Sequence, residues 1–280
     1  MGNTIRRKAV KLLKEAGREV SSKEELLEAL VSAFQEEKQL RQHLNSYIPE
    51  PVRDRVIGWQ KDKRMSGERR MATVMFVDVC GFTTISEQLD PETVVELLNR
   101  VFDVIVRSTK THGGSVDKFL GDAALISFGA PVTRGDDPTR ALLTALEIQQ
   151  VMKELEFTDV ILNGQPVKFK VSIGIHTGLV IAENIGNEQR MEYTVIGDTV
   201  NTSSRLRDLA RPGDIVVSET TRKNVQDLFA FTPIGECNLK GREKSVRAYL
   251  LGAHVQRLQQ KANLRTGCFV GRDHELRLLD

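Results

Sequence analysis

The sequence has little of three things that would mark a specialised class of protein: cysteine, net charge and long apolar runs. Its three cysteines, Cys80, Cys237 and Cys268, are odd in number and widely spaced. This pattern suits neither a disulfide framework nor a CxxC metal site. A reducing compartment is the simpler setting, so we expect a cytoplasmic protein.

Charge is close to balance, with 40 Lys and Arg against 38 Asp and Glu. A nearly neutral chain gives no general field for nucleic acid or an anionic membrane. No apolar run approaches the roughly 18 residues that cross a bilayer, and the charged N-terminus lacks a signal-peptide core. Because 40% of the 280 residues are hydrophobic, we expect one or two folded domains without membrane insertion or nucleic-acid binding.

Residues 1–48 have a helical pattern. Ser22 and Glu25 fit a capping box, and apolar residues recur at helical spacing as far as Tyr47. This N-terminal helical segment either packs on its own domain or serves as a coupling or dimerising helix. Residues 49–70 are basic and weakly patterned, which favours a solvated linker over a phosphate-binding segment.

The order of elements in the rest of the chain indicates the fold. An apolar run rich in β-forming residues at 71–79 precedes a helix that begins at 90–92. A strand hairpin, a second helix and another strand follow, and this order predicts an α+β fold with a ferredoxin-like βαββαβ palm. Further strand patterns predict an extended antiparallel or mixed sheet. The segments are a hairpin at 116–128, a helix at 138–155, a strand at 169–182, a helix at 199–210, and strands at 191–196, 215–218 and 246–251.

Two carboxylates are expected to meet at one edge of this sheet. Asp78 ends the first strand, and Asp122 lies in the turn of the hairpin that pairs beside it. Two close carboxylates repel each other unless cations lie between them, and hard oxygen ligands suit Mg²⁺ or Mn²⁺. Two such ions can activate a hydroxyl and clamp a phosphate. The alternatives are a turn-capping Asp122 and an Asp78 held by backbone amides or an arginine.

Two shorter signals point to phosphate chemistry. The stretch CGFT at 80–83 turns directly after Asp78, and backbone amides at such a turn can hold phosphate oxygens. Asn201 and Arg205 are four residues apart on a predicted helix, so they share a face and can address one developing negative charge. The alternatives are an ordinary strand-to-helix turn and a surface helix with a local hydrogen bond.

Three motifs in register make the chain resemble a known family. FVDVCGFT, VDKFLGDAALISFG and EYTVIGDTVNTSSRL occur in an order and separation similar to the catalytic domain of class III nucleotidyl cyclases, in particular the bacterial branch like soluble adenylyl cyclase. The resemblance assigns the catalytic domain to residues 71–253. In the tail, 254–280, residues 269–276 resemble the opening of the ATPase module that follows many bacterial cyclase domains. We therefore expect either a truncated module or a free tail there.

The resemblance implies a site for two Mg²⁺ or Mn²⁺ ions and a nucleoside triphosphate, with a role for each matching position. These positions are Asp78, Asp122 and the Val79 carbonyl for the metals; the Phe82 and Thr83 amides, Lys240 and Arg190 for phosphate; Lys118 and Thr194 for the base; and Asn201 and Arg205 for the transition state.

The two base-reading positions favour adenine. Adenine has an acceptor at N1 and an amino donor at N6, which match the Lys118 ammonium and the Thr194 hydroxyl. Guanine N1–H would face the ammonium donor to donor, and an unpaired polar group costs about 1–3 kcal/mol. Guanylyl relatives have an acidic residue where Lys118 stands, so the expected substrate is ATP, with 3′,5′-cyclic AMP and pyrophosphate as products. The alternative for Lys118 is an ion pair with Asp117 or Asp122.

The resemblance also implies a homodimer with shared active sites. In this family the metal carboxylates come from one chain and the base and transition-state residues from the other, and this chain carries both sets. The competing functions are a guanylate cyclase, a diguanylate cyclase and a nonenzymatic nucleotide-binding regulatory module. No GG[DE]EF turn supports the diguanylate cyclase, and the intact metal and transition-state positions argue against the regulatory module. His176 is interpreted as a structural histidine.

Overall fold

The computed structural model describes residues 67–187, 190–239 and 245–254, together with Gln35 and Gln39. The chain divides into two compact units, Met1–Gly58 and Trp59–Asp280. All strands and helices considered below belong to the second unit. Apart from the two glutamines, which are helical and exposed, the predicted N-terminal helical segment, residues 49–66 of the basic linker and the tail beyond His254 lie outside the described residues. The linker was predicted to extend to residue 70, but residues 68–70 already belong to the first strand of the sheet.

Four antiparallel strands and two helices form the centre of the second unit. The strands follow the order β2-β3-β1-β6, with one helix between β1 and β2 and the other between β3 and β6. This connectivity is the βαββαβ palm that the sequence predicts, so the fold class is confirmed. The elements are β1 (Glu68–Cys80), α5 (Pro91–Thr111), β2 (Ser115–Leu120), β3 (Ala123–Phe128), α6 (Asp137–Glu154) and β6 (Lys170–Asn187).

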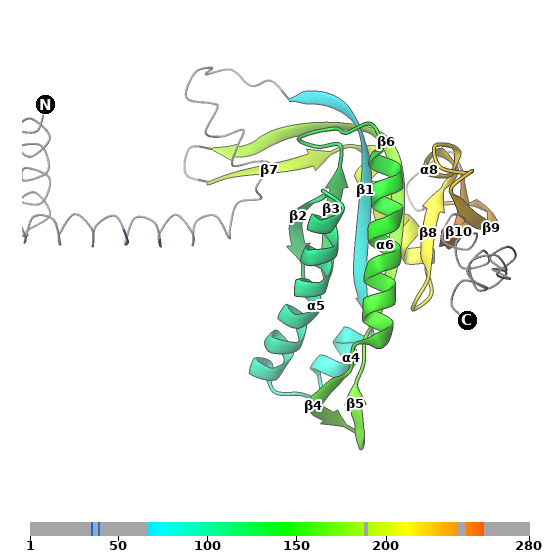
Figure 1. The fold of residues 1–280 in the computed structure, drawn as a ribbon. Coiled ribbons are helices and arrows are strands. Elements are labelled where there is room, and N and C mark those ends of the chain that lie inside the picture. Colours follow the sequence, from blue (N-terminus) through cyan, green and yellow to red (C-terminus); the bar gives the residue numbers. More distant parts are fainter. Residues whose placement is uncertain (1–34, 36–38, 40–66, 188–189, 240–244, 255–280) are drawn as a thin grey trace, which may run out of the picture. The chain divides into compact units, whose positions relative to one another are not determined.

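The sheet continues on the other side of β6, as expected. One added strand is parallel to β6 and the next two are antiparallel, so the sheet is mixed. A separate strand, β7, pairs with the second half of β6 to form a two-stranded arm (Figure 1). These strands are β7 (Arg190–Ile196), β8 (Ile215–Ser218), β9 (Phe229–Cys237) and β10 (Val246–His254).

Three small elements were not predicted. They are the short helix α8 (Glu219–Lys223) and the two strands of a hairpin, β4 (Phe157–Leu162) and β5 (Gln165–Val167). The short helix α4 (Phe82–Ser86) follows β1 directly, where a strand-to-helix turn was one of the interpretations of the sequence. Edge strand β9 was also missed. Its residues between Thr232 and Glu236 are all exposed and include a proline and a glycine, so the segment lacks the apolar alternation that marks a strand.

Helices cover both faces of the sheet. Alternate side chains of β1, such as Met75 and Val77, pack against α5 and α6 in the main core, and Figure 1 shows these two helices along one face. The intervening side chains, such as Val74 and Phe76, belong to a second core that Val200 contacts from α7 (Asp198–Leu209). Because successive side chains of β1 point to opposite faces of the sheet, this strand contributes to both cores.

Helix α7 lies very close to β1 and β6 because Gly174 has no side chain. A Cβ at this position would collide with the backbone of Ser203 and Arg207. The Ser203 hydroxyl lies 2.9 Å from the Val74 carbonyl oxygen and 2.8 Å from that of Gly174. This contact fixes the helix that carries the predicted transition-state residues.

Candidate active site

Asp78 and Asp122 come together where β1 and β3 pair. Asp78 lies opposite Ala123 in the antiparallel register, and the Val79 N–H donates to the Asp122 carbonyl at 3.3 Å. Burial raises the pKa of Asp78, and the negative charge of Asp122 raises it further. The structure thus brings together the two carboxylates that the sequence singles out.

Arg207 is the cation that contacts Asp78 within one chain. Its Nη1 lies 2.7 Å from the Asp78 Oδ1, and its Nη2 lies 3.0 Å from the Asp208 Oδ1. The guanidinium opposes the burial and lowers the pKa of Asp78, but the net direction remains upward. An arginine partner was one of the alternatives for Asp78, and this contact is present.

The donor atoms at this edge fit hard divalent cations. Two carboxylates of like charge and the carbonyl of buried Val79 offer only oxygen ligands, which Mg²⁺ and Mn²⁺ prefer. Within the described part of the chain, no cluster of three or more His, Cys, Asp or Glu side chains could hold a metal. Main-chain, water and phosphate oxygens would therefore have to complete the coordination. Mg²⁺ sites in proteins commonly use such ligands beside one or two carboxylates.

The chain turns sharply after Asp78 at Gly81, which adopts a φ of +75°. This left-handed conformation favours glycine. Helix α4 begins directly afterwards, so the Phe82 and Thr83 amides lie in its first turn, where a helix offers no internal acceptor. The Phe82 ring is 6.0 Å from the Phe169 ring, between centroids, which anchors the turn to the core.

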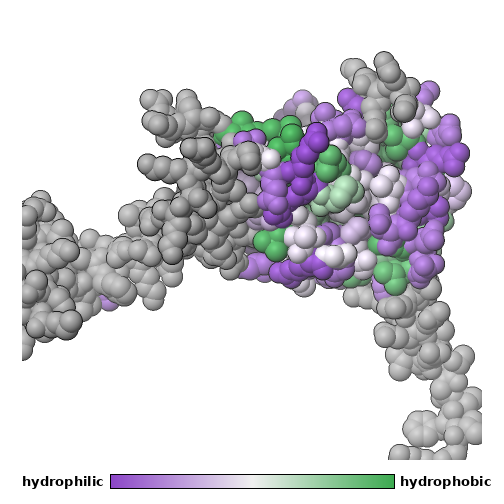
Figure 2. All heavy atoms as spheres, turned by 90° about the horizontal axis from the view of Figure 1, so that it is seen from above, coloured by the Kyte–Doolittle hydropathy of each residue, from purple (hydrophilic) through white to green (hydrophobic). Residues whose placement is uncertain are grey.

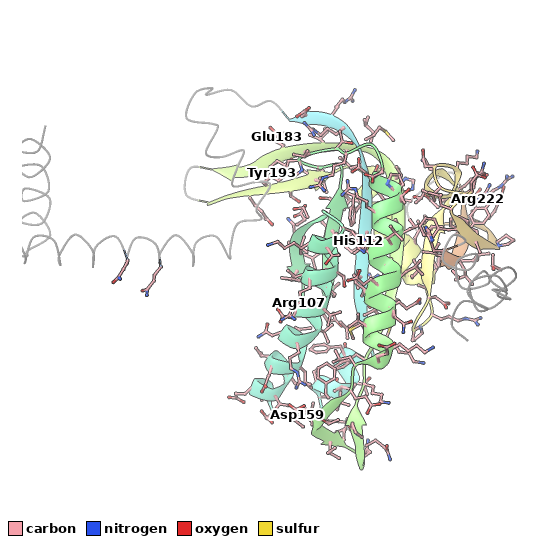
Figure 3. All side chains as sticks on the ribbon, in the orientation of Figure 1. Arg107, His112, Asp159, Glu183, Tyr193 and Arg222 are labelled. Atoms are coloured by element: carbon pink, nitrogen blue, oxygen red, sulfur yellow. The ribbon has the colours of Figure 1, made fainter. Side chains whose placement is uncertain are left out.

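Lys118 on β2 and Thr194 on β7 each contact an acid. The Lys118 Nζ lies 2.6 Å from the Glu192 Oε1 and 3.6 Å from the Asp117 Oδ1. The Thr194 hydroxyl donates to the Asp117 Oδ2 at 2.8 Å. Both contacts join β2 to the arm, whose strands carry the labelled Glu183 and Tyr193 in Figure 3. The alternative pairing of Lys118 with Asp117 is therefore present.

Asp117 is almost completely buried between β2 and β7, with 4% of its side chain exposed. Burial raises the pKa of Asp117, and the hydrogen bonds from Thr194 and Val195 oppose that rise. Sequence reasoning considered Asp117 only as a partner for Lys118. Its contact with Thr194 depends on where β7 lies relative to β2, and no local sequence pattern predicts that position.

Asn201 and Arg205 lie one turn apart on α7. Among the described residues, no hydrogen bond or ion pair joins either of them to Asp78 or Asp122, and Arg207 occupies that position instead. One chain therefore does not assemble the predicted transition-state residues with the predicted metal ligands. Arg207 was not singled out from the sequence, because two residues along a helix point to different faces.

Three further positions complete the comparison with the sequence. Arg190 begins β7, but its side chain lies outside the described part of the structure, as does Lys240. The His176 Nδ1 lies 2.8 Å from the Ser218 Oγ, between β6 and β8. That contact agrees with a structural histidine.

With this geometry established, comparison with known proteins identifies the family. Residues 66–253 match the model of the adenylate and guanylate cyclase catalytic domain. The chain therefore belongs to the class III nucleotidyl cyclases. Adenylate cyclase 1 of Rhizobium meliloti is 32% identical over 183 residues, which are 65% of this chain and 27% of that relative. The chain spans only 27% to 42% of the length of the curated relatives considered.

Solved structures of the family have the same fold. The adenylyl cyclase CyaB from P. aeruginosa aligns with a TM-score of 0.63 and 30% identity, covering 68% of this chain and 97% of CyaB. The guanylyl cyclase Cya2 aligns with a TM-score of 0.64 and 35% identity, covering 68% of this chain and 95% of Cya2. Neighbours of both specificities are thus similar to this chain. In the described ranges, no helix has the length and apolar character needed to span a bilayer.

Proposed function

We propose that this domain is an adenylate cyclase that works as a homodimer with shared active sites, in the cytoplasm. The convergence of Asp78 and Asp122 carries the proposal, because two adjacent carboxylates beside a turn of free amides suit metal-assisted chemistry on a triphosphate. Family membership supports a cyclase, and the similarity to Adenylate cyclase 1 and to CyaB is consistent with ATP as the substrate.

The proposed reaction is an in-line displacement at the α-phosphorus of ATP. The ribose 3′-oxygen forms the new P–O bond and releases its proton to water, while the bond to the leaving pyrophosphate breaks. Two Mg²⁺ or Mn²⁺ ions, held by Asp78, Asp122 and the Val79 carbonyl, would lower the pKa of the hydroxyl and neutralise phosphate charge when bound. The Phe82 and Thr83 amides orient the triphosphate from the first turn of α4.

Residues from α7 of the partner chain complete the proposed site. Arg205 offers a planar fork of donors to the charge that develops on the α-phosphoryl group, and Asn201 donates one further hydrogen bond. Lys240 and Arg190 contact the triphosphate in this proposal. Their contribution is binding rather than chemistry.

An apolar row on the sheet supports the proposed dimer. Met71 lies opposite Leu179 across β1 and β6, and Ile181 lies opposite Ile196 across β6 and β7. These four side chains are 57%, 50%, 39% and 46% exposed, respectively. Figure 2, which views the molecule from above relative to Figure 1, shows hydrophobic side chains at the surface among hydrophilic ones. Burial of such a row favours association.

A guanylate cyclase is the second candidate. Cya2 is as similar as CyaB, and Glu192 places an acid 2.6 Å from Lys118 in the base-reading region. A carboxylate in that region can accept from guanine N1–H. Lys118 itself has the opposite polarity, and for that reason ATP is preferred here.

One assay tests the proposal: purified protein is incubated with ATP or GTP and with Mg²⁺ or Mn²⁺, and cyclic products are separated by chromatography. Cyclic AMP as the main product is expected. Lys118→Glu should lower the kcat/KM for ATP by about tenfold, since it reverses one contact to the base. A preference for GTP would support the second candidate, and no cyclic product from either nucleotide would support a nonenzymatic module.

A further inference from the structure

We propose that Asp117 is a positioning residue that fixes the Thr194 hydroxyl as a hydrogen-bond acceptor toward the base. A hydroxyl can normally donate or accept, so it does not discriminate between a 6-amino and a 6-oxo purine. Asp117 removes that freedom and makes the position selective for the 6-amino group of adenine. This inference rests on the proposed function, because it assigns Thr194 to the base.

The hydrogen-bond geometry determines the polarity. The Asp117 Oδ2 accepts the Val195 backbone N–H at 3.1 Å and contacts the Thr194 hydroxyl at 2.8 Å. The Val195 N–H can only donate, and the ionised Asp117 carboxylate can only accept. The Thr194 hydroxyl therefore donates its single proton to Asp117. Only lone pairs remain on the hydroxyl oxygen for a ligand.

A β-bulge in β2 directs Asp117 to this contact. Val116 pairs with Ile126 and Lys118 pairs with Leu125, so Asp117 is the extra residue without a partner in β3. In a regular strand, the side chains of residues 117 and 118 would point to opposite faces. Here the side chains of Asp117 and Lys118 both contact β7. The bulge explains this, because an extra residue in a strand changes the direction of the side chains beside it.

The two groups that contact these acids offer opposite polarities to a ligand. Glu192 and Thr194 are two residues apart on β7, so they share a face of the strand. Lys118, which contacts Glu192 and Asp117, can only donate. Thr194 is left only to accept. One donor beside one acceptor matches N1 and N6 of adenine, whereas N1–H and O6 of guanine reverse both requirements.

The burial of this pair makes its arrangement durable. Asp117 is 4% exposed in its side chain and Thr194 is 7% exposed overall, so water competes little for either hydrogen bond. The acceptor direction of Thr194 is therefore set before a nucleotide arrives. An exposed threonine would instead rotate to suit either base.

Binding of nucleotides that cannot cyclise tests the inference independently of turnover. We would titrate 2′,3′-dideoxy-ATP and 2′,3′-dideoxy-GTP into the full chain with Mn²⁺ and measure both Kd values by calorimetry. The wild type should prefer dideoxy-ATP. Asp117→Ala should reduce the ratio of the two Kd values by about fivefold, the scale of one hydrogen bond. The change should come largely from tighter binding of dideoxy-GTP, because the freed hydroxyl can donate to O6.

Matched variants separate positioning from general structure. Asp117→Asn keeps an acceptor oxygen for the Val195 N–H and the Thr194 hydroxyl, so it should preserve the ratio. Asp117→Ser leaves room for a water that can bond in either direction, so it should behave like Asp117→Ala and serves if that variant does not fold. Asp159→Ala removes an exposed acid that pairs with Arg100 and contacts neither Asp117 nor Thr194, so it should leave the ratio unchanged.

A double-mutant cycle completes the test. Thr194→Val by itself should reduce the ratio of the two Kd values. Adding Asp117→Ala to that variant should reduce the ratio no further. An unchanged ratio in Asp117→Ala, or an equal loss of both nucleotides, would overturn the inference. So would a wild type that prefers dideoxy-GTP or binds neither nucleotide. A wild type that prefers dideoxy-ATP but forms no cyclic AMP would contradict the proposed function alone.

Discussion

The candidate site has two ends, and their charges have different partners. One end, called the phosphate end, is at the end of β1, and the other, called the base end, is between β2 and β7. At the end of β1, Asp78 contacts Arg207 and feels the negative charge of Asp122, and burial raises the pKa of Asp78. Between β2 and β7, Lys118 pairs with an acid and Asp117 accepts two hydrogen bonds. In the proposed site, metal ions would complete the end that holds phosphate, whereas hydrogen bonds within the chain already join Asp117 to Thr194 and Val195 at the end that holds the base. Substitutions should consequently act on chemistry at the first end and on selectivity at the second.

The strongest way to test this contrast is to remove the carboxylates. Asp78→Ala and Asp122→Ala should each lower kcat by about a thousandfold or more, because metal-assisted charge stabilisation supplies several kcal/mol. The measurement is cyclic AMP production with saturating ATP and Mn²⁺. Far-ultraviolet circular dichroism and thermal unfolding should remain close to wild type, because neither side chain belongs to a core cluster.

Those folding measurements are the control for this prediction. If either alanine variant retained more than a tenth of the wild-type kcat, the assignment of the metal ligands would be wrong. A variant that lost activity together with its cooperative unfolding would show a structural role instead.

The next largest effect concerns Arg205 on α7. Within the described part of one chain, Arg205 forms no hydrogen bond or ion pair with Asp78 or Asp122. Arg205→Ala should lower kcat by about 100-fold to 1000-fold, the scale of one lost oxyanion donor. The KM for ATP should change much less, because the interaction is made mainly in the transition state. Steady-state kinetics with varied ATP measure both values.

Mixing variants then tests whether the ends of the site come from different chains. Random pairing of Asp78→Ala and Arg205→Ala chains gives half heterodimers, each with one intact site, so about a quarter of the wild-type activity should return. Two chains with the same substitution provide the control and should stay inactive. No recovery would contradict the shared site.

Much of this contrast could be predicted from the sequence. The alternating pattern of β1, the Asp90-Pro91 start of α5 and the turn at Gly121 are local signals, and they place Asp78 and Asp122 at one edge correctly. The hairpin of β4 and β5 was predictable too. It turns at Asn163 and Gly164, both with positive φ, and an Asn-Gly pair is a strong hairpin signal.

The contacts between distant segments could not be predicted in this way. Arg207 reaches Asp78 only because Gly174 lets α7 lie close to the sheet. Asp117 reaches Thr194 only because β2 contains a bulge and β7 folds back beside it. Each of these two contacts depends on how distant segments of the chain are arranged. A single sequence has no local pattern that predicts such an arrangement.

A smaller effect should follow from removing the arginine at the phosphate end. Arg207→Ala takes away a positive charge 2.7 Å from Asp78, so Mn²⁺ should bind about threefold to tenfold more tightly, the scale of a partly exposed ion pair. The electron paramagnetic resonance signal of free Mn²⁺ measures this without nucleotide. Arg211→Ala, an exposed arginine just after the same helix, is the control. Weaker binding in Arg207→Ala would mean that the arginine orients Asp78 for the metal.

The smallest expected effect is on stability, and its sign follows from the raised pKa of Asp78. The folded state favours the protonated carboxyl, so the ionised form costs stability at neutral pH. This cost disappears as the pH falls through the raised pKa toward the ordinary value of 3.8. Asp78→Asn should therefore raise Tm by about 2 °C at pH 7 without metal, and calorimetry near pH 4 should find a smaller difference.

Asp90 provides a control of opposite sign. Hydrogen bonds from the Thr93 amide and hydroxyl lower the pKa of Asp90 at the start of α5. Its ionised form therefore contributes stability above the ordinary pKa, and that contribution is lost as the pH falls through the lowered value. Asp90→Asn should lower Tm at pH 7, because the helix loses a negative charge at its N-terminus. If Asp78→Asn also lowered Tm at pH 7, the ion pair with Arg207 would outweigh the burial of Asp78, and the phosphate end would be balanced without cations.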